Sequence, residues 1–404
     1  MFVAVMGYGT VGSGVAEVLK MNAGSIKKKC GFELELKRIL DIRKFPGDPF
    51  EDIITDKFDD ILTDPEIEVV AETMGGLHPA YEFVSALLKS GKSVVTSNKE
   101  LVAVKGRELL ECAKANGANF LFEASTGGGI PVLRPVSQCL VGNEITHVAG
   151  ILNGTTNYIL TEMIKNDTAF EDALASAQKL GYAEKDPTAD VDGIDALRKI
   201  CILADLCFGK NVDPGSVKAI GIRNVNLADV EAAKKLGGAI KLIGSADRLG
   251  DGRIAVTVCP SFVKNGSQLA ACDDVFNCVL VRGNAVGEVC FYGPGAGKLP
   301  TASAVVADMA DCAKHNGCDR SPEWDEGSEG YVVSGDDFVS EWLVRASGSE
   351  SGIAGAIPGA KIISAAAESS EVCFTTPELS YGSLNALLGS AGAQALSVIR
   401  ITDY

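Results

Sequence analysis

The chain has 404 residues, of which 46% are hydrophobic, and its formal net charge is −16. Because single hydrophobic cores rarely grow beyond about 250–300 residues, this length predicts two or three domains. The acidic balance argues against nucleic acid as a partner, since binding to phosphates requires a basic surface.

A glycine-rich turn follows the first apolar run of the chain. The first strand is predicted over residues 2–5, and it leads into a G-x-G-x-x-G turn, Gly7-Tyr8-Gly9-Thr10-Val11-Gly12, that opens an amphipathic helix. Gly7 permits the tight turn, Gly9 leaves room for a pyrophosphate, and Gly12 allows close packing of helix on strand. Since the helix N-terminus also offers unpaired N–H groups to an anion, the pattern predicts dinucleotide binding.

Strands and helices alternate over the first 125 residues. Further strands are predicted over 34–42, 67–74, 93–96 and 120–123, with helices over 79–88 and 100–116. This alternation predicts a Rossmann-type parallel sheet with right-handed crossovers. Ligands bind such sheets beyond the carboxyl ends of the strands, which here are the segments 73–76, 96–99 and 123–129.

The pattern changes to mixed α+β from residue 131. Helices are predicted over 131–140, 155–165, 169–179 and 192–208, and strands over 145–152, 239–247, 253–259 and 276–292. A second glycine-rich turn, at 293–297, precedes a helix over 301–315 that we expect to return to the first domain. A polar linker over 319–335 leads to a small unit with strands over 338–346, 360–366, 371–375 and 394–402 and a helix over 380–390.

The number and spacing of the cysteines and histidines indicate the cellular compartment and whether a metal site is expected. Twelve cysteines without a C-x-x-C pair and only three histidines argue against a zinc site and indicate a reducing compartment. No run of 18 apolar residues occurs, so no membrane span is expected. We therefore expect a cytoplasmic protein.

Asp195 and Lys199 stand four residues apart on a predicted helix and therefore share one of its faces. The same face continues through Ile202 and Leu206, which predicts that it is buried. On an exposed helix the pair would be an ordinary solvated ion pair, but charges on a buried face need a partner or a function. The pair is therefore a candidate catalytic pair.

Three other segments carry candidate site residues. The loop before this helix holds four carboxylates over 184–192 without EF-hand spacing, which suits the capture of a substrate ammonium group. Lys99 follows a predicted strand, where it can stabilise charge on a carbonyl or alcohol oxygen, or serve as an ordinary first-turn lysine. The N–H groups that open the helix after Asn153 can hold a carboxylate, although an N-cap alone would also explain Thr155.

Four long runs together resemble the homoserine dehydrogenase family. In chain order they are VVTSNKELVA (94–103), ILNGTTNYIL (151–160), GYAEKDPTADVDGIDALRK (181–199) and GPGAGKLPTASAVVADM (293–309). The resemblance covers about residues 1–320. It implies the reversible, NAD(P)-dependent interconversion of L-homoserine and L-aspartate 4-semialdehyde, a branch step toward threonine, methionine and isoleucine.

The resemblance also implies a role for each matching residue. Lys199 would donate the proton to the aldehyde oxygen, and Lys99 would assist beside the nicotinamide. The substrate-binding residues would be Glu184, at the substrate amino group, with Asp195, Asn153, Gly154, Thr155 and Tyr182. The cofactor-binding residues would be Gly7, Tyr8, Gly9, Thr10, Val11, Gly12, Arg43, Thr96, Ser97, Lys99, Gly181 and Gly295.

A monovalent cation, usually sodium, is a further implication of the resemblance. Its ligands would be Glu123, Thr126, Gly128 and Ile130, three of them through backbone carbonyls, so that threonine in place of the family's commoner valine at 126 need not matter. The alternative for this segment is a glycine-rich hinge between domains.

The choice between NAD and NADP stays open. Asp41, at the end of the second strand, can accept a hydrogen bond from the adenosine ribose 2′-OH, which favours NAD. Arg43 and Lys44 can neutralise a 2′-phosphate, which favours NADP. The family resemblance moves the expectation slightly toward NADP.

The resemblance completes the expected fold, which is α/β in three parts. Residues 1–130, with the helix over 301–316, form the Rossmann domain, and residues 131–300 form an α+β substrate and dimerisation domain. Residues 336–404 form a degenerate ACT-like unit in which one helix is missing, and this unit serves dimerisation or binds threonine. We expect a homodimer or homotetramer that acts on a small-molecule substrate, without a nucleic-acid or membrane partner.

Two other functions compete with this reading. A different Rossmann-fold amino-acid or semialdehyde dehydrogenase with a covalent cysteine needs a thiol beside a base, and Cys139 is its nearest candidate. A non-catalytic nucleotide sensor would not need Lys99, Glu184, Asp195 and Lys199, which are all present.

Overall fold

The computed structural model describes residues 1–315, 317–366 and 371–404. The chain divides into two compact units, each built from several segments. Unit 1 comprises Met1–Gly142, Cys201–Asp213 and Gly293–Gly327, and unit 2 comprises Asn143–Ile200, Pro214–Tyr292 and Ser328–Tyr404. The predicted end of a helix at residue 316 lies outside the described residues.

A six-stranded parallel sheet forms the centre of unit 1, in the order β3-β2-β1-β4-β5-β6. Its strands are β1 (Phe2–Met6), β2 (Glu35–Leu40), β3 (Ile54–Thr55), β4 (Ile67–Glu72), β5 (Ser93–Thr96) and β6 (Phe120–Leu121). Strands covered on both faces read as unbroken apolar runs, and Val3, Ala4 and Val5 are fully buried. The predicted Rossmann-type sheet is confirmed, and its strand order is the dinucleotide-binding one.

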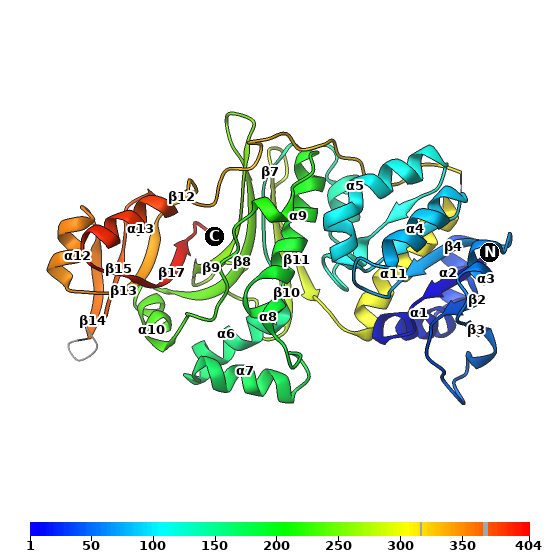
Figure 1. Cartoon of the computed structure of the whole chain (residues 1–404), viewed down its shortest axis with the longest axis horizontal. Coiled ribbons are helices and arrows are strands. Elements are labelled where there is room, and N and C mark those ends of the chain that lie inside the picture. The colour runs from blue at the N-terminus through cyan, green and yellow to red at the C-terminus, as the bar shows by residue number, and fades with distance from the viewer. Residues whose placement is uncertain (316, 367–370) are drawn as a thin grey trace. The chain divides into compact units, whose positions relative to one another are not determined.

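Helices cover this sheet, among them one from late in the chain. They are α1 (Thr10–Met21), α2 (Ala23–Cys30), α3 (Asp59–Leu62), α4 (Ala80–Lys89), α5 (Lys99–Ala115) and α11 (Lys298–Lys314). Figure 1 shows α11 beside α1, where Ala302, Val305 and Met309 share one hydrophobic core with Val15 and Leu19. α11 thus completes the cover of the sheet from some 280 residues further along the chain.

A nine-stranded sheet runs through unit 2, in the order β11-β10-β7-β8-β9-β17-β13-β15-β14. Its first five strands come from the middle of the chain: β7 (Ile145–Ile151), β8 (Gly238–Arg248), β9 (Ile254–Lys264), β10 (Phe276–Gly283) and β11 (Gly287–Pro294). The helices connected to them are α6 (Gly154–Asn166), α7 (Phe170–Lys179), α8 (Thr188–Val191), α9 (Ile194–Phe208), whose last eight residues belong to unit 1, and α10 (Leu227–Lys235).

The C-terminal part of unit 2 is a βαββαβ motif of the ferredoxin-like kind. Its elements are β13 (Trp342–Ser347), α12 (Glu350–Ala356), β14 (Lys361–Ala366), β15 (Glu371–Thr375), α13 (Tyr381–Ser390) and β17 (Ala395–Ile401), and a separate pair is formed by β12 (Val339–Ser340) and β16 (Leu379–Ser380). β17 pairs in parallel with β9, so the C-terminal strands extend the central sheet. The prediction that one helix is missing here is wrong, because α12 is formed and its Ile353 is buried in the core of this part.

Two other sequence-based expectations are corrected. The helix predicted over 131–140 is π-helical over Pro135–Cys139. Pro135 has no N–H to donate, and the Leu140 N–H bonds to the Pro135 carbonyl five residues back. The single strand predicted over 276–292 is a hairpin of β10 and β11, whose turn is held by the bond from the Val286 N–H to Asn143 Oδ1. In the described part of the chain, none of the helices has the length and apolar character needed to span a membrane.

Candidate active site

The glycine-rich turn after β1 has the shape of a pyrophosphate cradle. Gly7 has a φ of +89°, which L side chains rarely adopt, and a Cβ on Gly12 would lie 1.8 Å from the Gly7 carbonyl oxygen. A Cβ on Gly9 would fall in open space, with Arg43 Nη2 as its nearest neighbour at 4.0 Å. The first and third glycines are therefore needed for packing, and the second leaves the approach to the N-terminus of α1, at Thr10 and Val11, unobstructed.

A cavity of about 540 Å³ opens beside this turn in unit 1. Gly7, Gly9, Asp41, Arg43 and Thr73 are among the residues that line it. Asp41 Oδ2 accepts the Tyr8 N–H at 2.7 Å, so the end of β2 is tied to the glycine turn. Hydrogen bonds from Arg43 hold the pKa of Asp41 at about 2, so Asp41 is a carboxylate at any neutral pH.

Glu72, at the carboxyl end of β4, organises the neighbouring turns. It is fully buried, and it accepts hydrogen bonds from Thr96 Oγ1 at 2.5 Å and from the Met74 N–H at 2.7 Å. Burial raises the pKa of this carboxyl. Glu72 could not be predicted as a site residue, because an acid that ends an apolar strand shows no partner in the sequence around it. Its hydroxyl donor lies 24 residues further along the chain.

Lys99 begins α5, directly after the turn that Glu72 organises. Asn98 caps this helix, since its side chain accepts the Leu101 N–H at 3.1 Å and its amide donates to the Gly76 carbonyl. Thr96 is buried, and Ser97 and Lys99 are half-buried. The predicted residues Thr96, Ser97 and Lys99 therefore lie at one edge of the parallel sheet, beyond the carboxyl ends of its strands.

The predicted pair on α9 is a buried ion pair in unit 2. Lys199 Nζ lies 2.8 Å from Asp195 Oδ2, and the two side chains are only 10% and 7% exposed. The same ammonium group donates to the Leu152 carbonyl at 2.7 Å. The residue after Leu152 completes the cluster, since Asn153 Nδ2 donates to Asp195 Oδ2 at 2.9 Å and to Asp190 Oδ1 at 2.7 Å. Asp190 is a member of this cluster that was not predicted from the sequence.

The remaining predicted substrate residues lie around the start of α6. Gly154 begins that helix, and Thr155 Oγ1 donates to the Tyr182 carbonyl at 2.6 Å. Gly181, Tyr182 and Glu184 are exposed within unit 2. The structure thus brings Asn153, Asp195 and Lys199 into direct contact, and it places the Glu184 carboxylate outside that cluster.

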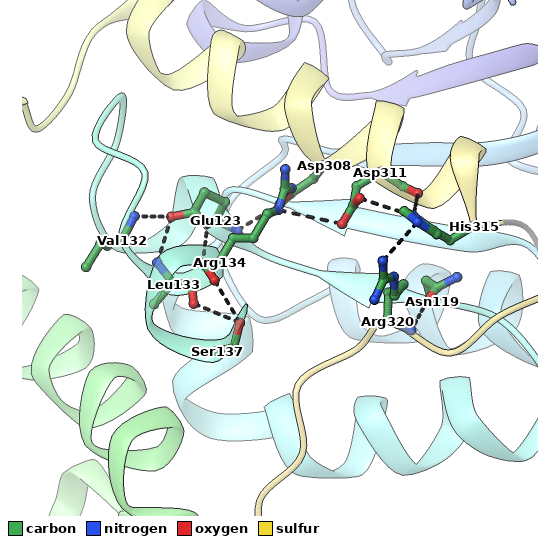
Figure 2. Close-up of polar contacts among 10 residues, drawn as sticks. All are labelled: Asn119, Glu123, Val132, Leu133, Arg134, Ser137, Asp308, Asp311, His315 and Arg320. Carbon is green, nitrogen blue, oxygen red and sulfur yellow. Dashed lines mark hydrogen bonds and ion pairs between the residues drawn. The ribbon is translucent and has the colours of Figure 1, made fainter. Parts of the chain in front are cut away.

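The predicted cation segment centres on Glu123, which Figure 2 shows amid several donors. Its carboxylate accepts the N–H groups of Val132, Leu133 and Arg134 at 2.6, 2.8 and 2.7 Å. These bonds use three of the roughly four acceptor positions of a carboxylate. One position is left for a cation, so most ligands would have to be backbone carbonyls.

Asp308 of α11 joins this network from the far side (Figure 2). It accepts the Glu123 N–H at 2.8 Å and pairs with the Arg134 guanidinium, which also contacts Asp311. Complete burial raises the pKa of Asp308 to about 7. Among the described residues no cluster of three or more His, Cys, Asp or Glu side chains suits a metal ion.

The two glycine-rich turns of unit 1 pack against each other. Gly128 has a φ of +60°, and a Cβ on it would lie 2.1 Å from the Gly295 carbonyl oxygen. The Gly129 N–H bonds to the Pro294 carbonyl at 3.1 Å, and the Ile130 N–H bonds to the Gly127 carbonyl. Thr126 and Ile130 are buried. Gly295, predicted to bind cofactor, thus also packs on the predicted cation segment.

A covalent cysteine mechanism gains no support from the histidines. His78 bonds to Glu82, His147 to Asp247, and His315 to Asp311, so each ring has an acidic or backbone partner in the described chain. Cys139 is exposed, and no histidine bond to it occurs among the described residues.

Known proteins match this chain over most of its length. The model of the homoserine dehydrogenase NAD-binding domain matches residues 7–123, and the homoserine dehydrogenase model matches residues 131–310. The homoserine dehydrogenase of Bacillus subtilis is 44% identical over 316 residues, which are 78% of this chain and 73% of that protein. The chain belongs to the homoserine dehydrogenase family.

Solved structures of homoserine dehydrogenases agree with this assignment. The Thiobacillus denitrificans protein aligns with a TM-score of 0.89 at 33% identity, over 100% of this chain and 98% of that one. A hyperthermophilic archaeal homoserine dehydrogenase, solved in complex with NADPH, aligns with a TM-score of 0.65 at 27% identity over 77% of this chain and 97% of that one. The first of these alignments includes the C-terminal βαββαβ part.

Proposed function

We propose that this member of the homoserine dehydrogenase family interconverts L-homoserine and L-aspartate 4-semialdehyde reversibly, using NADP or NAD. As a family member it is an NAD(P)-dependent oxidoreductase that acts on a CH–OH group of a small molecule. The observation that carries the proposal is the buried Asp195–Lys199 pair next to Asn153, in a chain whose first turn is shaped for a pyrophosphate.

Lys199 acts on the substrate oxygen in this proposal. When bound, the nicotinamide supplies or accepts the hydride at C4 of the substrate. Lys199 gives a proton to the aldehyde oxygen during reduction and recovers it during oxidation. Asp195 and the Leu152 carbonyl fix the ammonium group in place, since both accept hydrogen bonds from it. Lys99, at the cofactor edge of the sheet in unit 1, assists by stabilising negative charge that develops in the reaction.

The substrate is held by groups of the second unit. Glu184, which is exposed within unit 2, accepts hydrogen bonds from the substrate ammonium group. The N–H groups at Gly154 and Thr155, which open α6, take the substrate carboxylate. Asn153 orients Asp195 through its amide, and Tyr182 contacts the substrate, whereas Gly181 belongs to the cofactor-binding residues. Gly7 to Gly12, Arg43, Thr96, Ser97 and Gly295 belong to the cofactor side.

A sodium ion belongs to the proposal as a structural cation. The one acceptor position left on Glu123, with the carbonyls of Thr126, Gly128 and Ile130, would supply its hard oxygen ligands. Thermal unfolding in sodium chloride against choline chloride, at equal ionic strength, tests this. A melting temperature that is the same in both salts would count against the cation.

The assembly and the C-terminal part complete the proposal. We propose a cytoplasmic homodimer or homotetramer built on residues 131–300, with a Rossmann domain over 1–130 and 301–316 and an ACT-like domain over 336–404. Phe276 and Tyr292 support an interface, because they stack at 5.2 Å yet stay 36% and 57% exposed on the hairpin at the sheet edge. Light scattering after size exclusion measures the assembly, and a monomer would refute it.

A spectrophotometric assay tests the activity itself. Purified protein with L-homoserine and either oxidised dinucleotide should produce absorbance at the wavelength of the reduced nicotinamide. Asp195→Ala should damage turnover of homoserine more than dinucleotide affinity. If wild-type protein binds dinucleotide but reduces none, the chain is a nucleotide sensor and the enzymatic proposal fails.

A further inference from the structure

Two cysteine side chains contact each other across the hairpin of β10 and β11. The sulfur atoms of Cys278 and Cys290 are 3.0 Å apart, although both residues are free thiols. Neighbouring strands lie about 4.8 Å apart, which is within the range of about 4.4–6.8 Å that a disulfide requires between its Cα atoms. Since a disulfide bond is about 2.05 Å long, the two sulfurs need to approach by only about 1 Å. The pair is therefore placed for oxidation.

The two thiols differ in their access to solvent. Cys290 is exposed, whereas Cys278 is only 1% exposed, and burial together with the Cys290 thiol raises the pKa of Cys278. Attack on an oxidant requires an accessible sulfur, so Cys290 is the thiol that reacts first. Cys278 is shielded from reagents in solution but contacts the Cys290 sulfur, so its reaction is with that sulfur. The pair thus combines an attacking thiol with a resolving thiol.

The buried cysteine also lies beside the strand that leads into the candidate active site. β10 pairs with β7, and in their register Cys278 is opposite Ile151, the last residue of β7. The two backbones are close together, since a Cβ on Gly150 would lie 2.7 Å from the Cys278 carbonyl oxygen. Ile151 is followed by Leu152, whose carbonyl accepts a hydrogen bond from the Lys199 ammonium group at 2.7 Å. A shift of the Cys278 backbone therefore displaces a group that positions Lys199.

We infer that Cys278 and Cys290 are an oxidisable dithiol that closes to an intrachain disulfide and thereby slows the reaction at Lys199. Cys290 attacks one sulfur of the oxidant, a low-molecular-weight disulfide, so that a mixed disulfide forms and one small thiolate leaves. Cys278 then attacks the Cys290 sulfur, the bond between the two cysteines forms, and the second small thiolate leaves. Each leaving thiolate takes up the proton of one cysteine, so two protein thiols are oxidised and one small disulfide is reduced to two thiols. Only the effect on the reaction rests on the proposed function.

Mass spectrometry after oxidation with glutathione disulfide tests the dithiol without any turnover. The remaining thiols are alkylated, and trypsin then separates the two cysteines, so the bond should link peptide 265–282 to peptide 283–298. Fragmentation of the linked peptides distinguishes Cys278 from Cys272, which is in the same peptide. Dithiothreitol should separate the two peptides again, because the reaction is reversible.

Three variants separate the steps of this oxidation. Cys290→Ser should form no link, and Cys278→Ala should stop at a mixed disulfide of Cys290 with glutathione. Cys318→Ser is the matched control, because Cys318 is also exposed but contacts no other thiol among the described residues, and it should form the link as the wild type does. Circular dichroism verifies that each variant is folded.

The same samples measure the effect on the reaction. Oxidation should lower kcat for homoserine about ten-fold in the wild type and in Cys318→Ser. A misplacement of about 1 Å can cost about a hundred-fold in rate, and here the two cysteines share the movement. In Cys290→Ser, glutathione disulfide should leave kcat unchanged, and dithiothreitol should restore kcat of the oxidised wild type.

Three results would overturn the inference. They are the absence of the linked peptides in the oxidised wild type, a cross-link between two copies of the chain on a non-reducing gel, and an equal kcat in the oxidised and the reduced wild type. The assembled protein is used throughout, because Cys290 lies two residues from Tyr292 on β11 and so shares the face proposed above as an interface. If the reduced protein binds dinucleotide but oxidises no homoserine, the proposed function fails, and the linked peptides still decide whether the dithiol exists.

Discussion

Replacing Lys199 with methionine separates the chemistry of the site from its stability. The methionine fills a similar volume but carries no charge, so Asp195 loses the ammonium group 2.8 Å away. Asn153 Nδ2 still donates to the same carboxylate oxygen. The carboxylate therefore stays buried with a neutral donor in place of a cation.

The burial of the pair sets the expected magnitude. An exposed ion pair contributes about 0.2–1 kcal/mol, whereas removal of one partner from a buried pair costs about 3–5 kcal/mol. Exposures of 10% and 7% place this pair in the second class. Adding Asp195→Asn to Lys199→Met removes the stranded charge, so the double variant should recover most of the lost stability. Because both variants lack the proposed proton donor, both should lose about 10²–10⁴-fold in turnover.

Urea unfolding and initial rates of homoserine oxidation measure the two effects on the same samples. Lys235→Met is the matched control, because Lys235 pairs with Glu231 at the same i,i+4 spacing and at 2.9 Å, with exposures of 48% and 67%. It should change the free energy of unfolding by less than about 1 kcal/mol. The reasoning is refuted if Lys199→Met costs no more than this control, or if the double variant regains turnover together with its stability.

Three further substitutions, two of them with a matched control variant, test other parts of the structure. Gly12→Ala should abolish dinucleotide binding and lower stability by roughly 1–3 kcal/mol or more, because its Cβ would lie 1.8 Å from a carbonyl oxygen. Gly24→Ala, a helix position with nothing within 4 Å, should be neutral or stabilising in the same titration and melt. Asp308 has a folded pKa of about 7 against 3.8 unfolded, so its ionisation should cost stability progressively as pH rises from about 4 to 7. Between pH 5 and 8, the melting temperature of Asp308→Asn should therefore fall less than that of the wild type. An equal fall in both proteins would contradict this. Arg345→Met, which breaks a 3.1 Å pair with exposures of 7% and 2%, should cost about 3–5 kcal/mol in urea, while Arg253→Met, in a half-exposed pair, should cost under about 1 kcal/mol.

Local patterns predicted most elements of the fold but missed several short helices, among them α12 and α10. β5 and β15 were predicted to the residue, since each is a short apolar run with clear limits. α12 was missed because its seven residues include two glycines, which disfavour a helix; Ile353 forms it by burial against the C-terminal sheet. α10 was missed although Asn226 and Asp229 form a capping box, a signal that was present in the sequence.

The part of the candidate site that lies on a single helix could be predicted from the sequence. The 3.6-residue period alone put Asp195 and Lys199 on a buried face, and the structure shows them there. No periodicity could show that Asn153, which lies 42 residues before Asp195, donates to that acid. Asp190 joins through the same amide, so the cluster depends on how a strand end and a helix meet in three dimensions.

Three buried acids in unit 1 show why hydrogen-bond partners that are distant in the chain cannot be predicted from the sequence. Asp41 follows β2, Glu72 ends β4, and Glu123 follows β6, so all three stand at the carboxyl ends of parallel strands. Each accepts backbone N–H groups: from Tyr8, from Met74 and from the segment 132–134. A carboxylate buried without donors would cost several kcal/mol, so an acid in this position has to recruit the N–H groups of the loop beside it. The ligand-binding loops of a parallel sheet emerge at the same edge. Acids at that edge whose carboxylates accept N–H groups of these loops therefore also fix the shape of the cofactor site. An acid that ends an apolar strand in such a fold therefore predicts an ordered loop, even though the sequence does not reveal which N–H groups it will hold.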